Sequence, residues 1–162
     1  MKSTKALFLF LALILPVCIF LFLKFFGRNE FEVKPLFSDA PPEGSNCSAV
    51  AVPYVVPDSV TSQLRFENDS IVVVAFNDET NSISLNQIKR IREEVGSLPV
   101  GLLIFSGSER HLSWKNCVFF LKDSLDVVVV DRQGRIRGQY VSTDREDIDR
   151  LLTEITIILK RY

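Results

Sequence analysis

The chain has few of the residues that usually perform chemistry: among 162 residues there are three cysteines and one histidine. The cysteines are Cys18, Cys47 and Cys117, so no two have CxxC spacing, and four zinc ligands cannot be assembled. Lysine and arginine number 19 against 20 acidic residues, with no basic stripe. The sequence therefore gives no basis for a zinc domain, a CxxC oxidoreductase or a nucleic-acid-binding protein.

The same scarcity marks the loop that follows the first buried strand. Residues 71–95, IVVVAFNDETNSISLNQIKRIREEV, have the pattern of a strand, a polar loop and an amphipathic helix. In α/β domains the loop at the carboxyl end of such a strand usually holds the functional site. Here the loop from Asn77 to Ser84 has no cysteine, histidine, lysine or glycine. Its adjacent carboxylates, Asp78 and Glu79, have no third group to orient them, and we interpret them as solvated.

The first 27 residues have the composition of a membrane anchor. Residues 6–23 form an uncharged apolar run, and a helix of this length can cross a hydrocarbon core of roughly 30 Å. Pro16 lies inside this run, where a membrane helix tolerates proline. No small-x-small cleavage site follows the run. We predict one retained transmembrane helix over 1–27, with the charge asymmetry slightly favouring a domain outside.

Residues 28–56 are rich in proline and predict a linker, loosest from Phe37 to Ala49, that ends in an extended lead-in. A globular domain is expected over 57–162. Its helix ending before Gly96 is expected to be capped by Ser82 or Ser84. The uncharged run over 100–105 predicts a second strand, parallel to the first, because both of its faces must be covered.

The second half of the domain predicts a short helix within 107–123, a hairpin over 125–140 and a closing helix. Gly134 supplies the positive φ that the hairpin turn needs. Thr143 and Glu146 have the spacing of a capping box, and an apolar stripe follows them. The element order is β-α-β, a helical connection, a β-hairpin and a closing helix. This is the order of a thioredoxin-like α/β fold, which by itself fixes no function.

Two stretches resemble a known family. Residues 127–155, VVVVDRQGRIRGQYVSTDREDIDRLLTEI, are similar to the carboxyl-terminal hairpin and helix of the SCO/SenC family. Residues 13–31 resemble the membrane segment of SCO-like proteins from Bacteroidetes-type bacteria. The resemblance implies a single-pass protein of the bacterial inner membrane, whose thioredoxin-like domain faces the periplasm. It also implies a role with copper or thiols during cytochrome c oxidase maturation.

The chain departs from that family at every copper-binding position. The family holds copper with a CxxxC motif after the first strand and a histidine before the hairpin, and soft thiolates with imidazole suit that metal. One alignment places Glu79 and Ile83 at the cysteine positions, and the other places Thr80 and Ser84 there. The histidine position falls near Asp123. The resemblance thus implies a degenerate member, for which we predict no metal site and no cofactor.

The remaining candidates are the two cysteines outside the anchor and the histidine. Cys47 and Cys117 could form a disulfide in an oxidising compartment. We favour by about two to one the interpretation of Cys117 as a buried small hydrophobe, given its apolar neighbours Val118 to Phe120. A catalytic dithiol is disfavoured, because neither cysteine opens a helix. A lone His111 without a nearby thiol is more often a surface residue than a metal ligand.

Three hypotheses about function follow. The first is a non-enzymatic, membrane-anchored binding or assembly factor related to oxidase maturation, with respiratory oxidase assembly components as partners. The second is a redox protein that works through Cys47 and Cys117. The third is a copper carrier with an unrecognised ligand set. The first requires no missing residue, and we favour it.

Overall fold

The structure is a computed structural model that divides into two units, Met1–Phe31 and Glu32–Tyr162. It describes residues 2–26, 32–42, 47, 51–64, 66, 69–77, 81–122 and 124–160. The predicted linker over 28–56 therefore contributes its described residues from 32 onward to the second unit.

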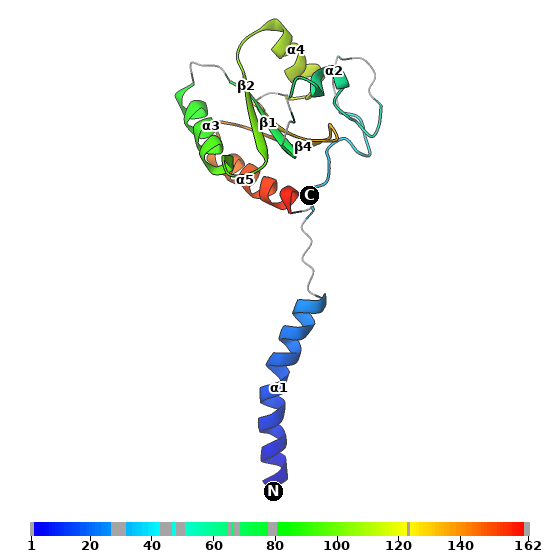
Figure 1. The fold of residues 1–162 in the computed structure, drawn as a ribbon, viewed down its shortest axis with the longest axis vertical. Coiled ribbons are helices and arrows are strands. Elements are labelled where there is room, and N and C mark those ends of the chain that lie inside the picture. Colours follow the sequence, from blue (N-terminus) through cyan, green and yellow to red (C-terminus); the bar gives the residue numbers. More distant parts are fainter. Residues whose placement is uncertain are drawn as a thin grey trace. The chain divides into compact units, whose positions relative to one another are not determined.

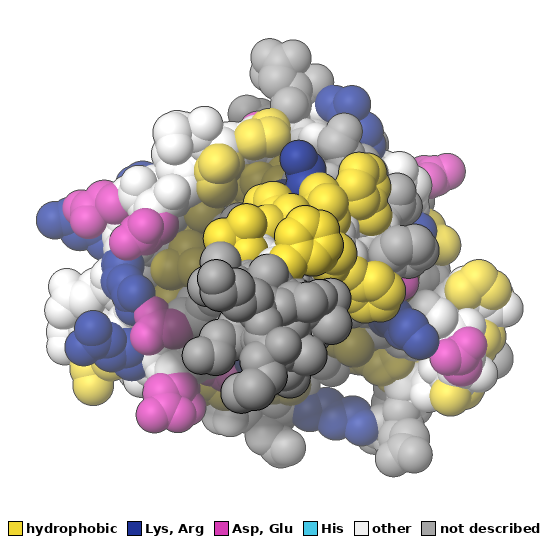
Figure 2. All heavy atoms as spheres, turned by 90° about the horizontal axis from the view of Figure 1, so that it is seen from below, with side chains coloured by type: hydrophobic (Ala, Val, Ile, Leu, Met, Phe, Trp, Pro, Cys, Tyr) yellow, Lys and Arg dark blue, Asp and Glu magenta, His cyan; other side chains and the backbone are white. Residues whose placement is uncertain are grey.

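The first unit contains helix α1, Lys2–Phe26, which passes through Pro16 without interruption. Its large apolar side chains between Phe10 and Phe25 whose exposure is described are exposed. Figure 2 shows hydrophobic side chains at the centre of its view and others scattered among acidic and basic side chains. No helix of the described residues combines the length and apolar character needed to cross a membrane.

The second unit is built on a four-stranded mixed sheet in the order β2-β1-β3-β4. Its strands are β1 (Ile71–Phe76), β2 (Val100–Phe105), β3 (Val127–Asp131) and β4 (Ile136–Tyr140). β1 pairs in parallel with β2, as the apolar run over 100–105 predicted. β3 pairs antiparallel with both β1 and β4. This strand order and these directions are those of a thioredoxin-like core.

Helices cover both faces of this sheet (Figure 1). On one face α3 (Ser82–Val95) and α5 (Arg145–Leu159) pack against alternate β1 and β3 side chains. On the other face lie α4 (Glu109–Cys117) and the single turn α2 (Asp58–Thr61). The described residues between 32 and 57, which we call the lead-in from here on, lie mainly on this face as well. β1 and β3 are buried on both faces, which explains their continuous runs of valine.

The lead-in is bonded to the hairpin rather than free of the domain. The Leu36 amide donates to the Ile136 carbonyl at 2.8 Å, and the Val56 amide donates to the Gly134 carbonyl at 2.8 Å. These bonds hold the lead-in to the first residue of β4 and to the hairpin turn before it. The folded unit thus begins earlier than residue 57. The prolines indicated a linker, but they could not show that its backbone would bond to the hairpin.

Two predicted helix caps are wrong. The α3 cap is Asn81, whose Oδ1 accepts from the amides of Ile83 and Ser84 at 3.1 and 3.2 Å. The α5 cap is Asp144, which accepts from the Glu146 amide at 2.9 Å, so Thr143 forms no capping box. Asparagine and aspartate reach the first-turn amides as well as serine and threonine do, so spacing alone did not separate them. The helix-ending position of Gly96 and the positive φ of Gly134, 74°, are confirmed.

Candidate functional site

The carboxyl end of β1 lies beside the amino end of α3, where the fold usually holds its site. Asn77, directly after β1, is buried, and its backbone N–H donates to the Phe105 carbonyl at 3.1 Å. Ser84, in the first turn of α3, is also buried and donates its hydroxyl to Asn77 Oδ1 at 2.9 Å. The two ends of the loop after β1 are therefore joined by a hydrogen bond between buried side chains.

Two further residues extend this arrangement. Ser142 follows β4 and is fully buried, with its Oγ 2.6 Å from Ser84 Oγ. The Ser142 amide donates to Asp126 Oδ1 at 2.6 Å, and its hydroxyl bonds Asp126 Oδ2. We call Asn77, Ser84, Ser142 and Asp126 the polar chain. It joins the ends of β1 and β4, the start of α3 and the residue before β3.

When Asp126 is ionised and Asn77 accepts through its oxygen, the polar chain has too few hydroxyl hydrogens for its three side-chain contacts. Three contacts, Asn77–Ser84, Ser84–Ser142 and Ser142–Asp126, each need one hydrogen, but two hydroxyls supply only two. With Asn77 accepting through Oδ1, the third hydrogen must come from a protonated Asp126. An ionised Asp126 requires the Asn77 amide to turn and donate through its nitrogen. The protonation of one end thus sets the direction of every bond.

The surroundings of Asp126 make its carboxyl easier to protonate than a solvated one. Burial raises the pKa of this carboxyl above its usual value, and the hydrogen bonds from Ser142 together with the charge of Lys115 offset only part of that rise. The polar chain is thus a self-satisfied, titratable link. None of its four side chains is a thiol or an imidazole.

The structure describes two of the residues that the resemblance aligns with copper ligands, Ile83 and Ser84. Ile83 is exposed and aliphatic, so it offers no donor atom. The hydroxyl of Ser84 is committed to Asn77 and Ser142. Neither supplies the thiolate that copper prefers. The other predicted positions, Glu79, Thr80 and Asp123, lie outside the described residues, as does Asp78.

The described part of the chain contains no group of three or more histidine, cysteine, aspartate or glutamate side chains that could hold a metal ion. His111 is half-buried and belongs to an aromatic group instead. Its ring stacks on Phe105 at 4.4 Å between centroids, and its Nδ1 lies 3.2 Å from the Ser106 carbonyl. Trp114 contacts the same Phe105 ring edge-on at 5.6 Å. These contacts give His111 a packing role in α4.

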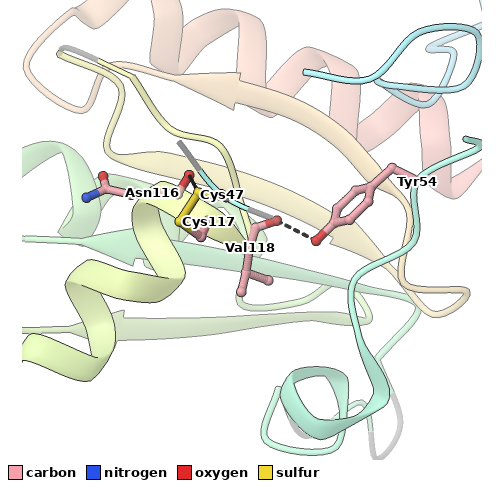
Figure 3. The surroundings of a disulfide bond; sticks show 5 residues. All are labelled: Cys47, Tyr54, Asn116, Cys117 and Val118. Carbon is pink, nitrogen blue, oxygen red and sulfur yellow. Dashed lines mark hydrogen bonds between the residues drawn. A yellow bond between two sulfur atoms is a disulfide. The ribbon is translucent and has the colours of Figure 1, made fainter. Parts of the chain in front are cut away.

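The structure brings Cys47 and Cys117 together in a disulfide, with the sulfurs 1.93 Å and the Cα atoms 5.5 Å apart (Figure 3). Cys117 is the last residue of α4 and is exposed. The interpretation of Cys117 as a buried small hydrophobe is therefore wrong. The apolar residues after Cys117 did not predict its own burial. Phe119 and Phe120 are buried, whereas Cys117 at the end of the helix is exposed.

Comparison with known proteins gives little. No protein-family model and no curated protein matches the chain. Among solved structures, the chain is similar to the solution structure of a putative protein disulfide isomerase from Bacteroides thetaiotaomicron. The identity is 15%, the TM-score is 0.43, and the match covers 61% of this chain and 77% of that one. The assignment of a thioredoxin-like core rests on the strand order and directions described above.

The sequence analysis missed Asn77, Ser142 and Asp126 as partners of Ser84. The sequence held one signal for two of them. Asn77 directly follows a run of apolar residues, and Asp126 directly precedes another such run. An antiparallel pairing of β1 with β3 puts these two ends at the same edge of the sheet, where the Phe76 amide donates to the Asp126 carbonyl at 2.8 Å. Ser142 had no such signal, because its position depends on how the chain leaves β4.

Proposed function

We propose that this chain is a membrane-anchored, thioredoxin-like binding or assembly factor without enzymatic activity. The observation that carries the proposal is the polar chain. Where this fold would hold reactive groups, the described residues Asn77, Ser84 and Ser142 hydrogen-bond one another and Asp126, and none of these four side chains is a thiol. A scaffold that keeps its fold but fills its site in this way suits recognition of another protein.

The disulfide supports export of the domain. Disulfides such as Cys47–Cys117 persist in oxidising compartments and are rare in the cytosol. The uncharged run over 6–23 supports an anchor on sequence grounds. The localisation proposed is thus the bacterial inner membrane, crossed once, with the folded domain in the periplasm.

The partner proposed is a component of respiratory oxidase assembly. Support comes from the resemblance of residues 127–155 to the SCO/SenC hairpin and helix, a stretch that forms β3, β4 and most of α5. The missing copper ligands argue for a partner that is recognised by its surface rather than one that receives metal. The chain would thus act as a degenerate relative in cytochrome c oxidase maturation.

A second candidate is thiol redox or copper handling through Cys47 and Cys117. One observation favours it: the two sulfurs are bonded, and Cys117 is exposed to exchange partners. Against it, the bond lies at the carboxyl end of α4, and thiols that catalyse exchange are activated at helix amino ends.

The experiment that separates the two uses the full chain in a mild detergent. For a binding factor we expect no turnover in a protein-disulfide reduction assay, no stoichiometric copper binding before or after reduction, and co-purification with oxidase subunits from native membranes. A matched variant with both Cys47 and Cys117 replaced by serine should retain the co-purification. Catalytic turnover that disappears in this variant would establish the redox candidate instead.

A further inference from the structure

Two residues of the lead-in, Cys47 and Tyr54, lie beside the carboxyl end of α4 (Figure 3). The Tyr54 hydroxyl donates to the Val118 carbonyl at 2.9 Å, and burial raises the pKa of this phenol to about 12, so it stays a donor. Cys47 Sγ lies 3.9 Å from the Asn116 carbonyl oxygen. The last carbonyls of a helix have no intrahelical partner, so Asn116 can accept a hydrogen bond there.

The two sulfurs of the disulfide have different surroundings. Cys117 is exposed, whereas Cys47 is half-buried. Both sulfurs lie at the carboxyl end of α4, so the helix dipole acts on both and gives no preference between them. Exchange also depends on which sulfur an attacking thiolate can reach. The greater exposure of Cys117 makes it the sulfur that is attacked, and Cys47 is then the sulfur that leaves.

We propose that the Cys47–Cys117 bond is a thiol-exchange site of fixed direction for the dithiol of an external oxidoreductase. A thiolate of that dithiol bonds to Cys117 Sγ, and the bond between the protein sulfurs breaks with its electron pair going to Cys47. The Cys47 thiolate takes a proton from water, and the resulting S–H group can donate a hydrogen bond to the Asn116 carbonyl. The second thiol of the oxidoreductase then attacks the mixed disulfide, which releases Cys117 and leaves the external dithiol oxidised by two electrons.

Other bonds hold the described chain on either side of Cys47 to the domain. The Leu36–Ile136 and Val56–Gly134 backbone bonds lie on either side of Cys47 in sequence and do not involve the disulfide. The Tyr54–Val118 bond does not involve it either. We therefore expect the domain to stay folded during exchange. This inference is independent of the partner proposed above, since a binding factor and a redox protein could each carry such a site.

The test traps the mixed disulfide. The oxidised full chain is exposed briefly to glutathione and quenched with acid, free thiols are blocked, and the peptides are mapped by mass spectrometry. We expect glutathione on the Cys117 peptide in excess of the Cys47 peptide by about tenfold or more. Cys47→Ser and Cys117→Ser variants, which have no disulfide to open, should acquire no glutathione under the same conditions.

Two results would overturn the inference. One is glutathione on Cys47 in equal or greater amount, which would remove the direction. The other is a disulfide that opens only after the domain is unfolded with denaturant, which would remove the accessible site. Neither result bears on co-purification with oxidase subunits, so the two proposals fail separately.

Discussion

The hydroxyl oxygens of Ser84 and Ser142 lie 2.6 Å apart, although 58 residues separate them in the chain. Both side chains are buried. The contact joins the first turn of α3 to the loop between β4 and α5, and it lies at the centre of the polar chain. Its energetic role can be measured directly.

Replacing Ser142 with alanine should destabilise the domain by about 1–3 kcal/mol, because Ser84 and Asp126 then lose a buried partner. Ser84→Ala should behave similarly. Urea unfolding of both single variants and the double variant should give a coupling free energy of about 0.5–3 kcal/mol. The exposed Ser113→Ala variant is the matched control and should change stability by less than about 0.5 kcal/mol. Additive single effects would contradict a direct bond.

Replacing Asp126 with asparagine should make stability less dependent on pH. Burial raises the pKa of this carboxyl above its ordinary 3.8, so the folded state binds the proton more tightly than the unfolded state. Stability from the neutral form is therefore complete below pH 3.8 and is lost as the pH rises through the raised pKa. Asparagine cannot ionise, and its nitrogen can donate to Ser142.

The free energy of unfolding of Asp126→Asn relative to wild type should accordingly increase with pH across that window. Urea unfolding at a series of pH values measures the difference, and carboxyl carbon chemical shifts follow Asp126 itself. A difference that stays constant with pH would show that the polar chain does not favour the neutral acid.

Reduction of the Cys47–Cys117 disulfide should lower the free energy of unfolding by about 2–4 kcal/mol, because the bond closes a long loop in the unfolded chain. The sequence separation of its cysteines is 70. Unfolding with and without reductant measures the loss. The double serine variant should show the same lower stability in both conditions. A reductant effect that persists in this variant would have to come from another source.

Replacing Gly138 with alanine should destabilise the domain by about 1–3 kcal/mol through overpacking. A Cβ at this position would lie 2.1 Å from the Tyr140 hydroxyl oxygen and 2.6 Å from the ring carbon that bears it. The ring would have to move, breaking the 2.6 Å bond to Glu154. Tyr140→Phe removes that bond alone, so thermal unfolding of both variants separates the clash from the bond. Equal effects would argue against the clash.

Much of the scaffold could be predicted because its signals are local. The valine runs of β1 and β3 indicate strands that are buried on both faces. Gly134 indicates a turn that needs a positive φ. The apolar spacing of α5 records the single face that it buries. The caps were harder, because asparagine, aspartate, serine and threonine all accept from first-turn amides.

The sequence by itself determined the element order from β1 to α5, the sheet-forming runs and the absence of thiols from the loop after β1, but not the single turn α2. It also limited a disulfide outside α1 to Cys47 and Cys117. Only the tertiary structure decided that Ser84 bonds Ser142 and that Cys117 is exposed. These contacts join residues 58 and 70 positions apart, and such distances are set by strand pairing and helix packing rather than by any local pattern.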